Sequence, residues 1–194
     1  MPTLHEIFDG LSKTLDPSVD WMELARDLEA PIAMPAFGMN FSKRWADKKD
    51  LLAISAMQGF VKEIEFMERS LEQGDRCLLL EEFDKICAFA WVTFRDYRLS
   101  LWHTVRLPAG FAYLVYIHVQ PEYRRKGVAT SLLSCLMLYL RKEGYRRLIS
   151  GMYGDWEASI RLHIKSGFKI CRKYTQRRIL RFFPYPPKET QISD

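Results

Sequence analysis

The sequence has 194 residues, of which 48% are hydrophobic and 13% aromatic, and its formal net charge is +5. This length and composition predict a single well-buried domain and argue against two. Apolar runs such as Ile86–Val92 fall far short of the roughly 18 residues that span a bilayer. The segment MPTLHEIFDG carries acids where a signal peptide carries cations. We therefore expect a cytoplasmic protein without a membrane partner.

The charges are distributed unevenly along the chain. Residues 121–181 hold 15 Lys and Arg against 4 Asp and Glu, whereas the rest of the chain holds 14 against 20. This basic half predicts an anionic ligand, either a nucleotide-like cofactor or a nucleic acid, although a solvated cationic face gives the same pattern. The four cysteines are widely separated and lack metal-ligand spacing, so we expect free thiols and no metal site.

The first part of the chain is expected to be largely helical. Thr3–Leu15 and Asp20–Glu29 are predicted to form two short helices. The stretch IAMPAFGMNF (residues 32–41) predicts a short first strand. An apolar stripe over Lys43–Leu71 predicts a helical region that Gly59 divides into two helices.

The rest of the chain shows the patterns of strands and two helices. The predicted elements are a hairpin of residues 77–82 and 85–94, a strand at 110–120, a helix over Val128–Lys142 ended by Gly144, a strand at 146–153, a helix over Trp156–Lys165 capped by Asp155, and terminal strands within 168–183. We expect a mixed α/β sandwich in which residues 1–30 form a helical extension, 31–184 the main domain and 185–194 an irregular tail.

The stretch PEYRRKGVATSLL (residues 121–133) places cations and a glycine at the start of the first of these helices. Helix N-terminal amides lack intrahelical acceptors, and the helix dipole is positive there, so this is a candidate anion site. Gly127 would let the backbone approach a phosphate without a Cβ in the way, and Thr130 would offer a hydroxyl. The alternative is an exposed basic turn.

Residues 124–129, RRKGVA, match the [Arg/Gln]-x-x-Gly-x-[Gly/Ala] signature of the GNAT superfamily of acyl-CoA-dependent N-acyltransferases. The preceding strand YLVYIHVQPEYR and the later unit LISGMYGDWEASIRLHIKSGF, which ends in a Gly-Phe pair, are also similar to that family. The resemblance covers roughly Arg76–Phe183.

The resemblance implies an α/β fold with a mixed, mostly antiparallel central sheet flanked by helices, and acetyl-CoA (coenzyme A) bound as acyl donor in a V-shaped opening. The pyrophosphate would lie on the backbone amides of Arg125–Thr130, and the pantetheine arm would pair with β backbone like an extra strand. The implied cofactor-binding residues are Ile117, His118, Val119, Arg124, Arg125, Lys126, Gly127, Val128, Ala129 and Thr130.

The implied activity is N-acetyl transfer to a primary amine, which attacks the thioester directly in a ternary complex. The family often has a tyrosine acid where this chain has His163, so His163 is a candidate acid or base, with Tyr153 as a second catalytic candidate. Tyr116 and His118 rank lower. Tyr113 occupies the position of a glutamate base found in some relatives. Cys135 is expected to be a buried thiol without a nucleophilic role.

The acceptor is expected to bind beside Arg95–Gly110 and the Lys43–Leu71 region. Aromatic residues there would suit an aromatic or sugar amine: Trp91, Trp102, His103 and Trp156. The expected partner is an amine, small molecule or protein, and a homodimer is left open. Two alternatives remain, a catalytically degenerate acyl-CoA sensor and a nucleic-acid-binding module that uses the basic segment CRKYTQRRILR.

Overall fold

The computed structural model describes residues 19–34, 41–60, 62–98, 104–176, 178–179, 183–184 and 188–191. Its strands are β1 (Val19–Asp27), β2 (Ser42–Trp45), β3 (Arg76–Glu82), β4 (Lys85–Thr93), β5 (Tyr97–Arg98), β6 (Thr104–Val105), β7 (Phe111–Val119), β8 (Arg147–Tyr153), β9 (Lys169–Gln176), β10 (Arg178–Ile179), β11 (Phe183–Pro184) and β12 (Lys188–Gln191). Its helices are α2 (Leu51–Ser55), α3 (Ile64–Glu72), α4 (Val128–Lys142) and α5 (Glu157–Lys165), with short 3-10 turns at Lys48–Asp50 and Pro121–Tyr123. Within these ranges, no helix is long and apolar enough to cross a membrane.

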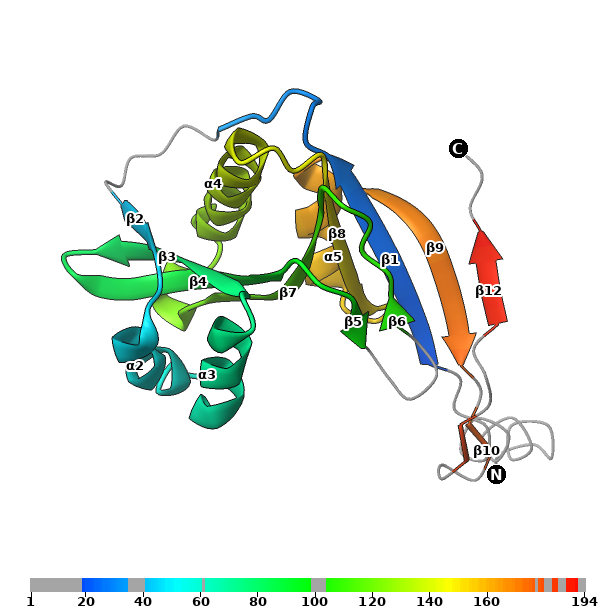
Figure 1. Cartoon of the computed structure of the whole chain (residues 1–194), viewed down its shortest axis with the longest axis horizontal. Helices are drawn as coiled ribbons and strands as arrows, with labels where there is room; N and C mark the ends of the chain where they lie inside the picture. The colour runs from blue at the N-terminus through cyan, green and yellow to red at the C-terminus, as the bar shows by residue number, and fades with distance from the viewer. Residues whose placement is uncertain are drawn as a thin grey trace, which may run out of the picture.

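The strands form one eight-stranded sheet in the order β12-β9-β1-β8-β7-β4-β3-β2. Every neighbouring pair in it is antiparallel except β7 and β8, which are parallel. Helices α4 and α5 cover one face, and α2 and α3 cover the other (Figure 1). The predicted mixed, mostly antiparallel sheet flanked by helices is therefore confirmed.

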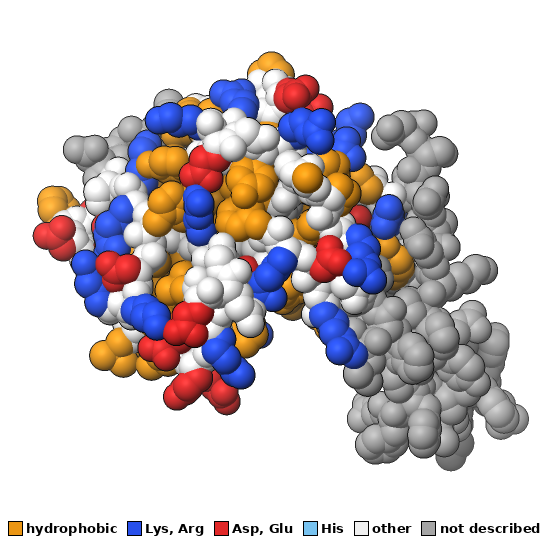
Figure 2. Space-filling view, viewed as in Figure 1, with side chains coloured by type: hydrophobic (Ala, Val, Ile, Leu, Met, Phe, Trp, Pro, Cys, Tyr) orange, Lys and Arg blue, Asp and Glu red, His pale blue; other side chains and the backbone are white. Residues whose placement is uncertain are grey.

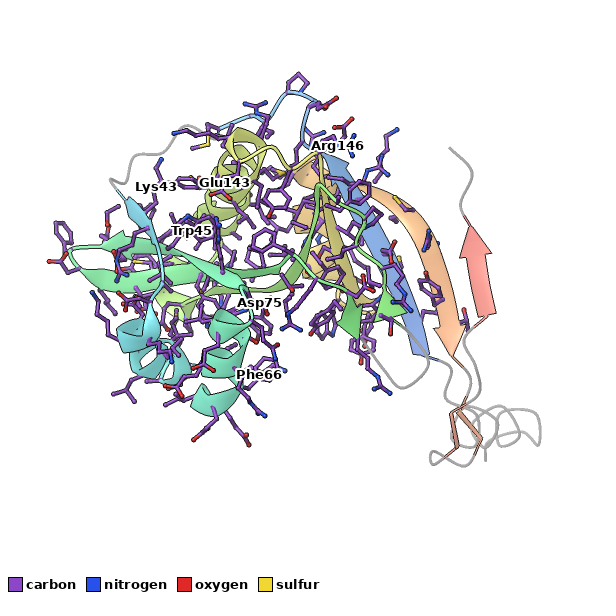
Figure 3. The ribbon with its side chains drawn as sticks, in the orientation of Figure 1. Lys43, Trp45, Phe66, Asp75, Glu143 and Arg146 are labelled. Carbon is purple, nitrogen blue, oxygen red and sulfur yellow. The ribbon has the colours of Figure 1, made fainter. Side chains whose placement is uncertain are left out.

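The two faces bury separate cores. The larger core lies under α4, where Leu132, Leu136 and Leu140 are fully buried against β3, β4 and β7. The second lies under α2 and α3 and includes Phe60 and Met67. Figure 3 shows Phe66 and Asp75 on the α3 side and Trp45 and Glu143 on the α4 side.

The parallel pair β7–β8 is short, and its strands diverge. Pairing runs only from Phe111 with Arg147 to Leu114 with Ser150. Beyond that point β7 continues along β4, while β8 continues along β1. Among the described strands, the β8-facing edge of β7 therefore has no partner from Val115 onward. This is the opening of the V that the resemblance implied.

A β-bulge lies at this divergence point. Trp91 of β4 is opposite Tyr116, whereas the next β4 residue, Val92, is opposite Leu114, so Val115 is the extra residue. Val115 and Tyr116 consequently both pack toward the α3 side, while Leu114 and Ile117 pack toward the α4 side. Bulges of this kind re-aim side chains and are common beside active sites.

The predicted helix over Asp20–Glu29 is wrong, because Val19–Asp27 form strand β1. This strand is antiparallel to both β8 and β9 and lies between them, so it belongs to the central sheet and not to a helical extension (Figure 1). Met22 and Leu24 pack under the α4 face, and Ala25 packs on the opposite face. This alternation requires a strand. The predicted helix Thr3–Leu15 lies outside the described residues.

Three further predictions need correction. The first strand of the middle region is Ser42–Trp45, while residues 32–34 form no strand and 35–40 are outside the described ranges. Asp155 is not the cap of α5, because the N-cap is Trp156, which has no side-chain capping bond. Part of the expected irregular tail, Lys188–Gln191, pairs with β9 as strand β12.

The other elements agree with their predictions. The strand hairpin, the third strand, the helix Val128–Lys142 and the strand before α5 all form where expected. Gly59 separates α2 from α3 with a φ of +80°, and Gly144 follows α4 with a φ of +88°. The four cysteines are free thiols, and burial raises the pKa of Cys135.

Candidate active site

The loop between β7 and α4 presents backbone amides at a helix start. Gly127 is the N-cap of α4 with φ +79° and ψ 0°, a left-handed conformation that favours glycine. Arg125 also has a positive φ, of +60°. The amides of Val128, Ala129 and Thr130 open a 15-residue helix and so lack intrahelical acceptors. The loop thus combines free donors with the positive end of the helix dipole.

A cavity of about 590 Å³, here called the donor cavity, lies over this loop. It is lined by Ile117, His118, Val119, Tyr123, Arg124, Arg125, Gly127, Val128, Ala129, Thr130, Ala158, Ser159, Leu162 and Lys165. The structure therefore brings all the predicted cofactor-binding residues together except Lys126. The Lys126 ammonium instead lies 5.7 Å from the centre of the Tyr123 ring. Arg124 also supports the loop, because its Nε donates to the Val119 carbonyl at 3.0 Å.

A smaller cavity of about 200 Å³, the junction cavity, lies where β7 and β8 diverge. It is lined by Leu114, Val115, Tyr116, Ile117, Ser150, Gly151, Met152, Trp156, Ser159 and His163. It shares Ile117 and Ser159 with the donor cavity. Because a cofactor arm that runs along β7 from the loop reaches this point next, the junction cavity is where its reactive end would lie.

His163 is the titratable side chain most directly placed at the junction. It is 1% exposed, and its Nδ1 is 2.8 Å from the Ser159 carbonyl oxygen. A carbonyl only accepts hydrogen bonds, so Nδ1 carries the proton and the neutral ring has a lone pair on Nε2. That Nε2 is buried without a partner. Burial lowers the pKa of His163, and the bond to Ser159 opposes this only in part. At neutral pH the ring is thus a base whose lone pair is unsatisfied.

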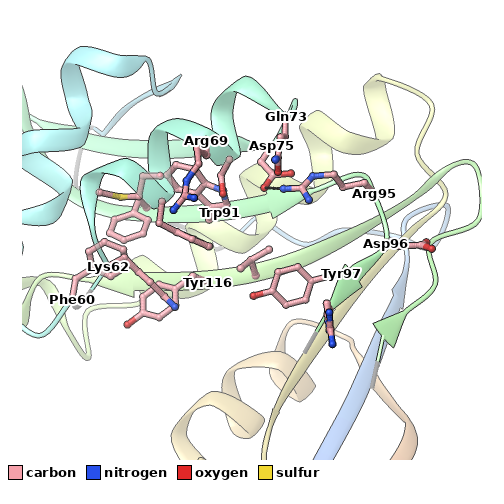
Figure 4. A pocket seen from close by; sticks show the side chains of 16 residues that line it. Phe60, Lys62, Arg69, Gln73, Asp75, Trp91, Arg95, Asp96, Tyr97 and Tyr116 are labelled. Carbon is pink, nitrogen blue, oxygen red and sulfur yellow. Dashed lines mark hydrogen bonds and ion pairs between the residues drawn. The ribbon is translucent and has the colours of Figure 1, made fainter. Parts of the chain in front are cut away.

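A third cavity, of about 360 Å³, lies on the α3 side of the sheet and is here called the acceptor cavity. It is lined by Phe60, Lys62, Phe66, Met67, Arg69, Ser70, Gln73, Asp75, Phe89, Trp91, Arg95, Asp96, Tyr97, Arg98, Val115 and Tyr116 (Figure 4). It shares Val115 and Tyr116 with the junction cavity, so the two meet across the bulged part of β7. The space-filling view shows a hollow between the α2–α3 lobe and the part that carries β5 and β6 (Figure 2).

Two buried polar groups in the acceptor cavity lack hydrogen-bond partners. Asp75 has a 5% exposed side chain, and its Oδ2 accepts from Arg95 at 3.1 Å while its Oδ1 has no partner. The indole Nε1 of Trp91 is also buried without a partner. An indole N–H can only donate, and a carboxylate can only accept. Buried polar groups without a partner among the described residues usually bind a water molecule or a ligand, or mark a functional site.

The sequence profile described as "Acetyltransferase (GNAT) family" matches residues 40–168, which is more than half of the chain. The chain belongs to the GNAT acetyltransferase family. An N-acetyltransferase from Staphylococcus aureus Mu50 is 28% identical, with a TM-score of 0.52 over 67% of this chain and 84% of that chain. A GCN5-related N-acetyltransferase from Sphaerobacter thermophilus is 14% identical, with a TM-score of 0.64 over 91% of this chain and 56% of that chain.

An aminoglycoside N-acetyltransferase solved in complex with CoA has a TM-score of 0.52 and 18% identity, over 66% of this chain and 91% of that chain. No curated protein matches the sequence significantly. The first solved structure compared, from Drosophila, and the Sphaerobacter structure are longer than this GNAT chain, which spans 56% of the length of each.

Of the other predicted catalytic residues of this GNAT chain, Tyr153 and His118 do not line the junction cavity. Tyr153 lines none of the three cavities; it is 39% exposed, and its ring packs against Trp21 and Trp156 with centroids 5.0 and 5.2 Å away. The His118 ring shares a face with Tyr116, as predicted, and stacks on Phe89 at 5.6 Å, toward the α3 core. Trp102 and His103 lie outside the described residues. No finding tests the catalytic roles of His163 and Tyr153.

Sequence reasoning missed several site residues. Asp75 was not among the predicted site residues, and Ser159 carried no signal, because it contributes a backbone carbonyl to His163. Gly151 is another: a Cβ there would lie 2.6 Å from the Tyr113 hydroxyl and closer still to the Trp21 ring. A glycine inside a predicted strand could have indicated a close backbone approach. Trp21 could not have been placed there while its segment was expected to be helical.

Proposed function

We propose that this chain transfers the acetyl group of acetyl-CoA to a primary amine, by direct attack in a ternary complex. The observation that carries the proposal is that the three cavities adjoin one another. The junction cavity shares lining residues with both the donor and the acceptor cavity. Two substrates held on opposite sides of β7 would therefore meet at one place, and no covalent enzyme intermediate is needed.

The donor fits the residues present. The amides of Arg125–Thr130 and the left-handed Gly127 would hold the pyrophosphate. The unpaired edge of β7 at Ile117–Val119 would pair with the pantetheine arm. A GNAT neighbour was solved in complex with CoA, which supports CoA as the ligand of this fold. The small junction cavity favours a short acyl chain, so acetyl-CoA is the proposed donor.

When bound, acetyl-CoA supplies an electrophilic thioester carbonyl. The Val115 amide, displaced from its register with β4 by the bulge, is the proposed donor that polarises this carbonyl oxygen. His163 Nε2 would accept the proton of the attacking amine as the carbon–nitrogen bond forms, and would return it to the sulfur as the carbon–sulfur bond breaks. The products are the acetamide and the free thiol of CoA, and His163 ends in its starting state.

The alternatives receive less support. A nucleic-acid module would need the cations of the segment around β9, but Arg172 lies 3.9 Å from the Glu23 carboxylate. A pure sensor would not need an unsatisfied base at the junction. A cytoplasmic location and a homodimer remain predictions.

The test is a calorimetric titration of the protein with acetyl-CoA, run beside Gly127→Glu. This substitution adds a side chain and a negative charge where the pyrophosphate would lie, and binding should be lost. Gly144→Glu is the matched control, because Gly144 also has a positive φ and a Cβ there would meet nothing within 4 Å. If Gly127→Glu binds like the wild type while Gly144→Glu also binds, the donor site is wrongly assigned.

A further inference from the structure

The acceptor cavity is lined by more cationic than anionic side chains. Four cations line it, Lys62, Arg69, Arg95 and Arg98, against two carboxylates, Asp75 and Asp96. A cavity with this excess of positive charge attracts anions and repels cations, and low-dielectric walls strengthen both effects.

The carboxylates are already balanced by the protein. Asp75 pairs with Arg95 at 3.1 Å, and Asp96 pairs with Arg106 at 2.6 Å. Hydrogen bonds from Leu107 and Arg106 lower the pKa of Asp96, so it stays ionised and paired at neutral pH. The charges of both carboxylates are therefore paired, and among their oxygens Oδ1 of Asp75 has no partner in the described residues and is left to accept from the ligand's amine.

Two of the cations are not balanced in this way. Lys62 Nζ lies 5.2 Å from the centre of the Phe66 ring, and Arg69 Nε donates to the Glu65 carbonyl at 3.2 Å. Among the described residues, neither of them forms an ion pair. Figure 4 shows Arg69 extending from α3 on one side of the cavity, opposite Tyr116 and Tyr97. A negative group bound on the α3 side would be the first counter-charge of these two residues.

The walls and floor of the cavity are aromatic. Phe60 packs edge-on against Phe89 and Tyr116 with centroids 4.9 and 5.0 Å away, and Phe89 stacks on Tyr116. Trp91 and Tyr97 continue this surface. A volume of about 360 Å³ is at the small end for ligand pockets, so it suits one ring or a similarly flat body.

The unpartnered Trp91 Nε1 points to a ligand independently of the charges. Trp91 lines this cavity, and its Nε1, which can only donate, is buried without a partner among the described residues. A carboxylate oxygen of a ligand would accept from it. We propose that the acceptor is a small primary amine with a flat aromatic body and a carboxylate or similar anionic group. Its anion is held by Lys62, Arg69 and Trp91, and its amine faces Val115 and Tyr116. This inference rests on the proposed acetyl transfer.

Three probes that share one ring and an aminomethyl group test this assignment. They are 4-(aminomethyl)benzoate, benzylamine and 4-(aminomethyl)benzylamine, in which the para substituent is negative, neutral and positive. The kcat/KM of the diamine is divided by two, because either of its two equivalent amines can react. Acetyl-CoA-dependent thiol release gives kcat/KM for each. We expect the benzoate to exceed the diamine by about tenfold, because two exposed cations attract the first and repel the second. Equal rates, or a preference for the diamine, would overturn the inference.

Two double variants test whether Lys62 and Arg69 cause the preference for the benzoate. Lys62→Gln with Arg69→Gln should remove most of the preference for the benzoate. Arg141→Gln with Lys142→Gln is the matched control, because both residues are exposed at the end of α4 and line none of the three cavities. A preference that persists in the first double variant would contradict the role of Lys62 and Arg69.

Acetyl-CoA titrations of the same samples distinguish a failure of the proposed function from a failure of the acceptor assignment. Loss of acetyl-CoA binding in wild-type protein would refute the proposed function itself. If acetyl-CoA binds but no probe is acetylated, 4-(aminomethyl)benzoate is titrated into CoA-saturated protein. Binding that weakens in the Lys62–Arg69 double variant supports the charge assignment, whereas absence of binding overturns it.

Discussion

The donor and acceptor cavities are built in opposite ways. The donor cavity takes most of its lining from one continuous stretch, residues 117–130, and its proposed contacts are backbone amides and an unpaired strand edge. The acceptor cavity takes side chains from α3, β4, β5, β7 and the segments between them. A backbone site depends on local conformation and tolerates side-chain changes, whereas a side-chain site changes with each substitution. Chains with the same donor loop can therefore differ in acceptor.

The largest effect is expected from a substitution in the junction cavity, where the donor and acceptor cavities meet. His163→Gln should lower kcat by about 100-fold, the lower end of the range for acid–base catalysis, while the affinity for acetyl-CoA changes little. The comparison variant is Tyr153→Phe, which removes the hydroxyl of the second catalytic candidate, a residue that lines none of the three cavities, and should lower kcat much less. Equal effects of the two variants would remove His163 from the chemistry.

The same residue predicts a pH dependence. Burial lowers the pKa of His163 from its usual 6.5, so the neutral base predominates above the lowered pKa. We expect kcat to be flat near pH 7 and to fall as the pH drops through that lower pKa. Folding stability should follow the same direction: the unfolded state binds the proton more readily, so stability declines below about pH 6.5. A kcat profile of His163→Gln that still shows this limb would contradict the assignment.

A substitution confined to the acceptor cavity should affect only one substrate. Trp91→Phe removes the unpartnered indole N–H and keeps an aromatic ring. Loss of one hydrogen bond is worth about 1 kcal/mol, so KM for 4-(aminomethyl)benzoate should rise about fivefold. KM for benzylamine, which lacks the carboxylate, should change less. A similar rise for both amines would indicate a packing effect, and a weaker binding of acetyl-CoA would show that the two cavities are not independent.

The smallest effect on catalysis is expected from a substitution of Arg44, whose ion pairs join the start of α2 to β3. Arg44 donates to Asp50 at the start of α2 and to Glu81 of β3, at 2.7 and 2.6 Å, and these carboxylates are buried. The hydrogen bonds from Arg44 lower the pKa of Asp50, so their contribution is present at neutral pH and is lost as the pH falls through that lowered pKa.

Arg44→Gln should therefore lower the free energy of unfolding at pH 7 by about 2 kcal/mol. This is less than for a fully buried ion pair, because the Arg44 side chain is 39% exposed. Urea unfolding at pH 7 and about pH 2 measures the effect, which should shrink at the lower pH because the pKa of Asp50 is lowered from 3.8 and its carboxylate becomes protonated only below that value. The rates with both amines should stay close to wild type under conditions where the variant is folded. A loss that is the same at both pH values would show that packing, and not charge, is responsible.

The donor half of the site could be predicted because its causes are local. A glycine that allows a left-handed conformation, followed by a regular apolar helix pattern, specifies a loop with free amides whatever surrounds it. Val128–Lys142 formed with the predicted bounds for this reason. The acceptor half could not be predicted in the same way. Asp75 and Trp91 are 16 residues apart and share a cavity only because β3 and β4 form a hairpin against α3.

The N-terminal strand shows what the sequence determined alone and what the tertiary structure decided. The segment VDWMELARD consists mostly of residues that favour helices, and its Leu24 is one helical turn from Leu28, which follows the segment, so local propensity and spacing both favoured a helix. In the fold, β8 and β9 offer it two strand edges, and pairing with both satisfies its backbone while Leu24 is fully buried. Local sequence determined the donor loop and its helix, because those depend on the conformation of neighbouring residues. Pairing between distant strands decided β1, the divergence of β7 from β8 and the acceptor cavity, because each of these exists only when several segments are brought together.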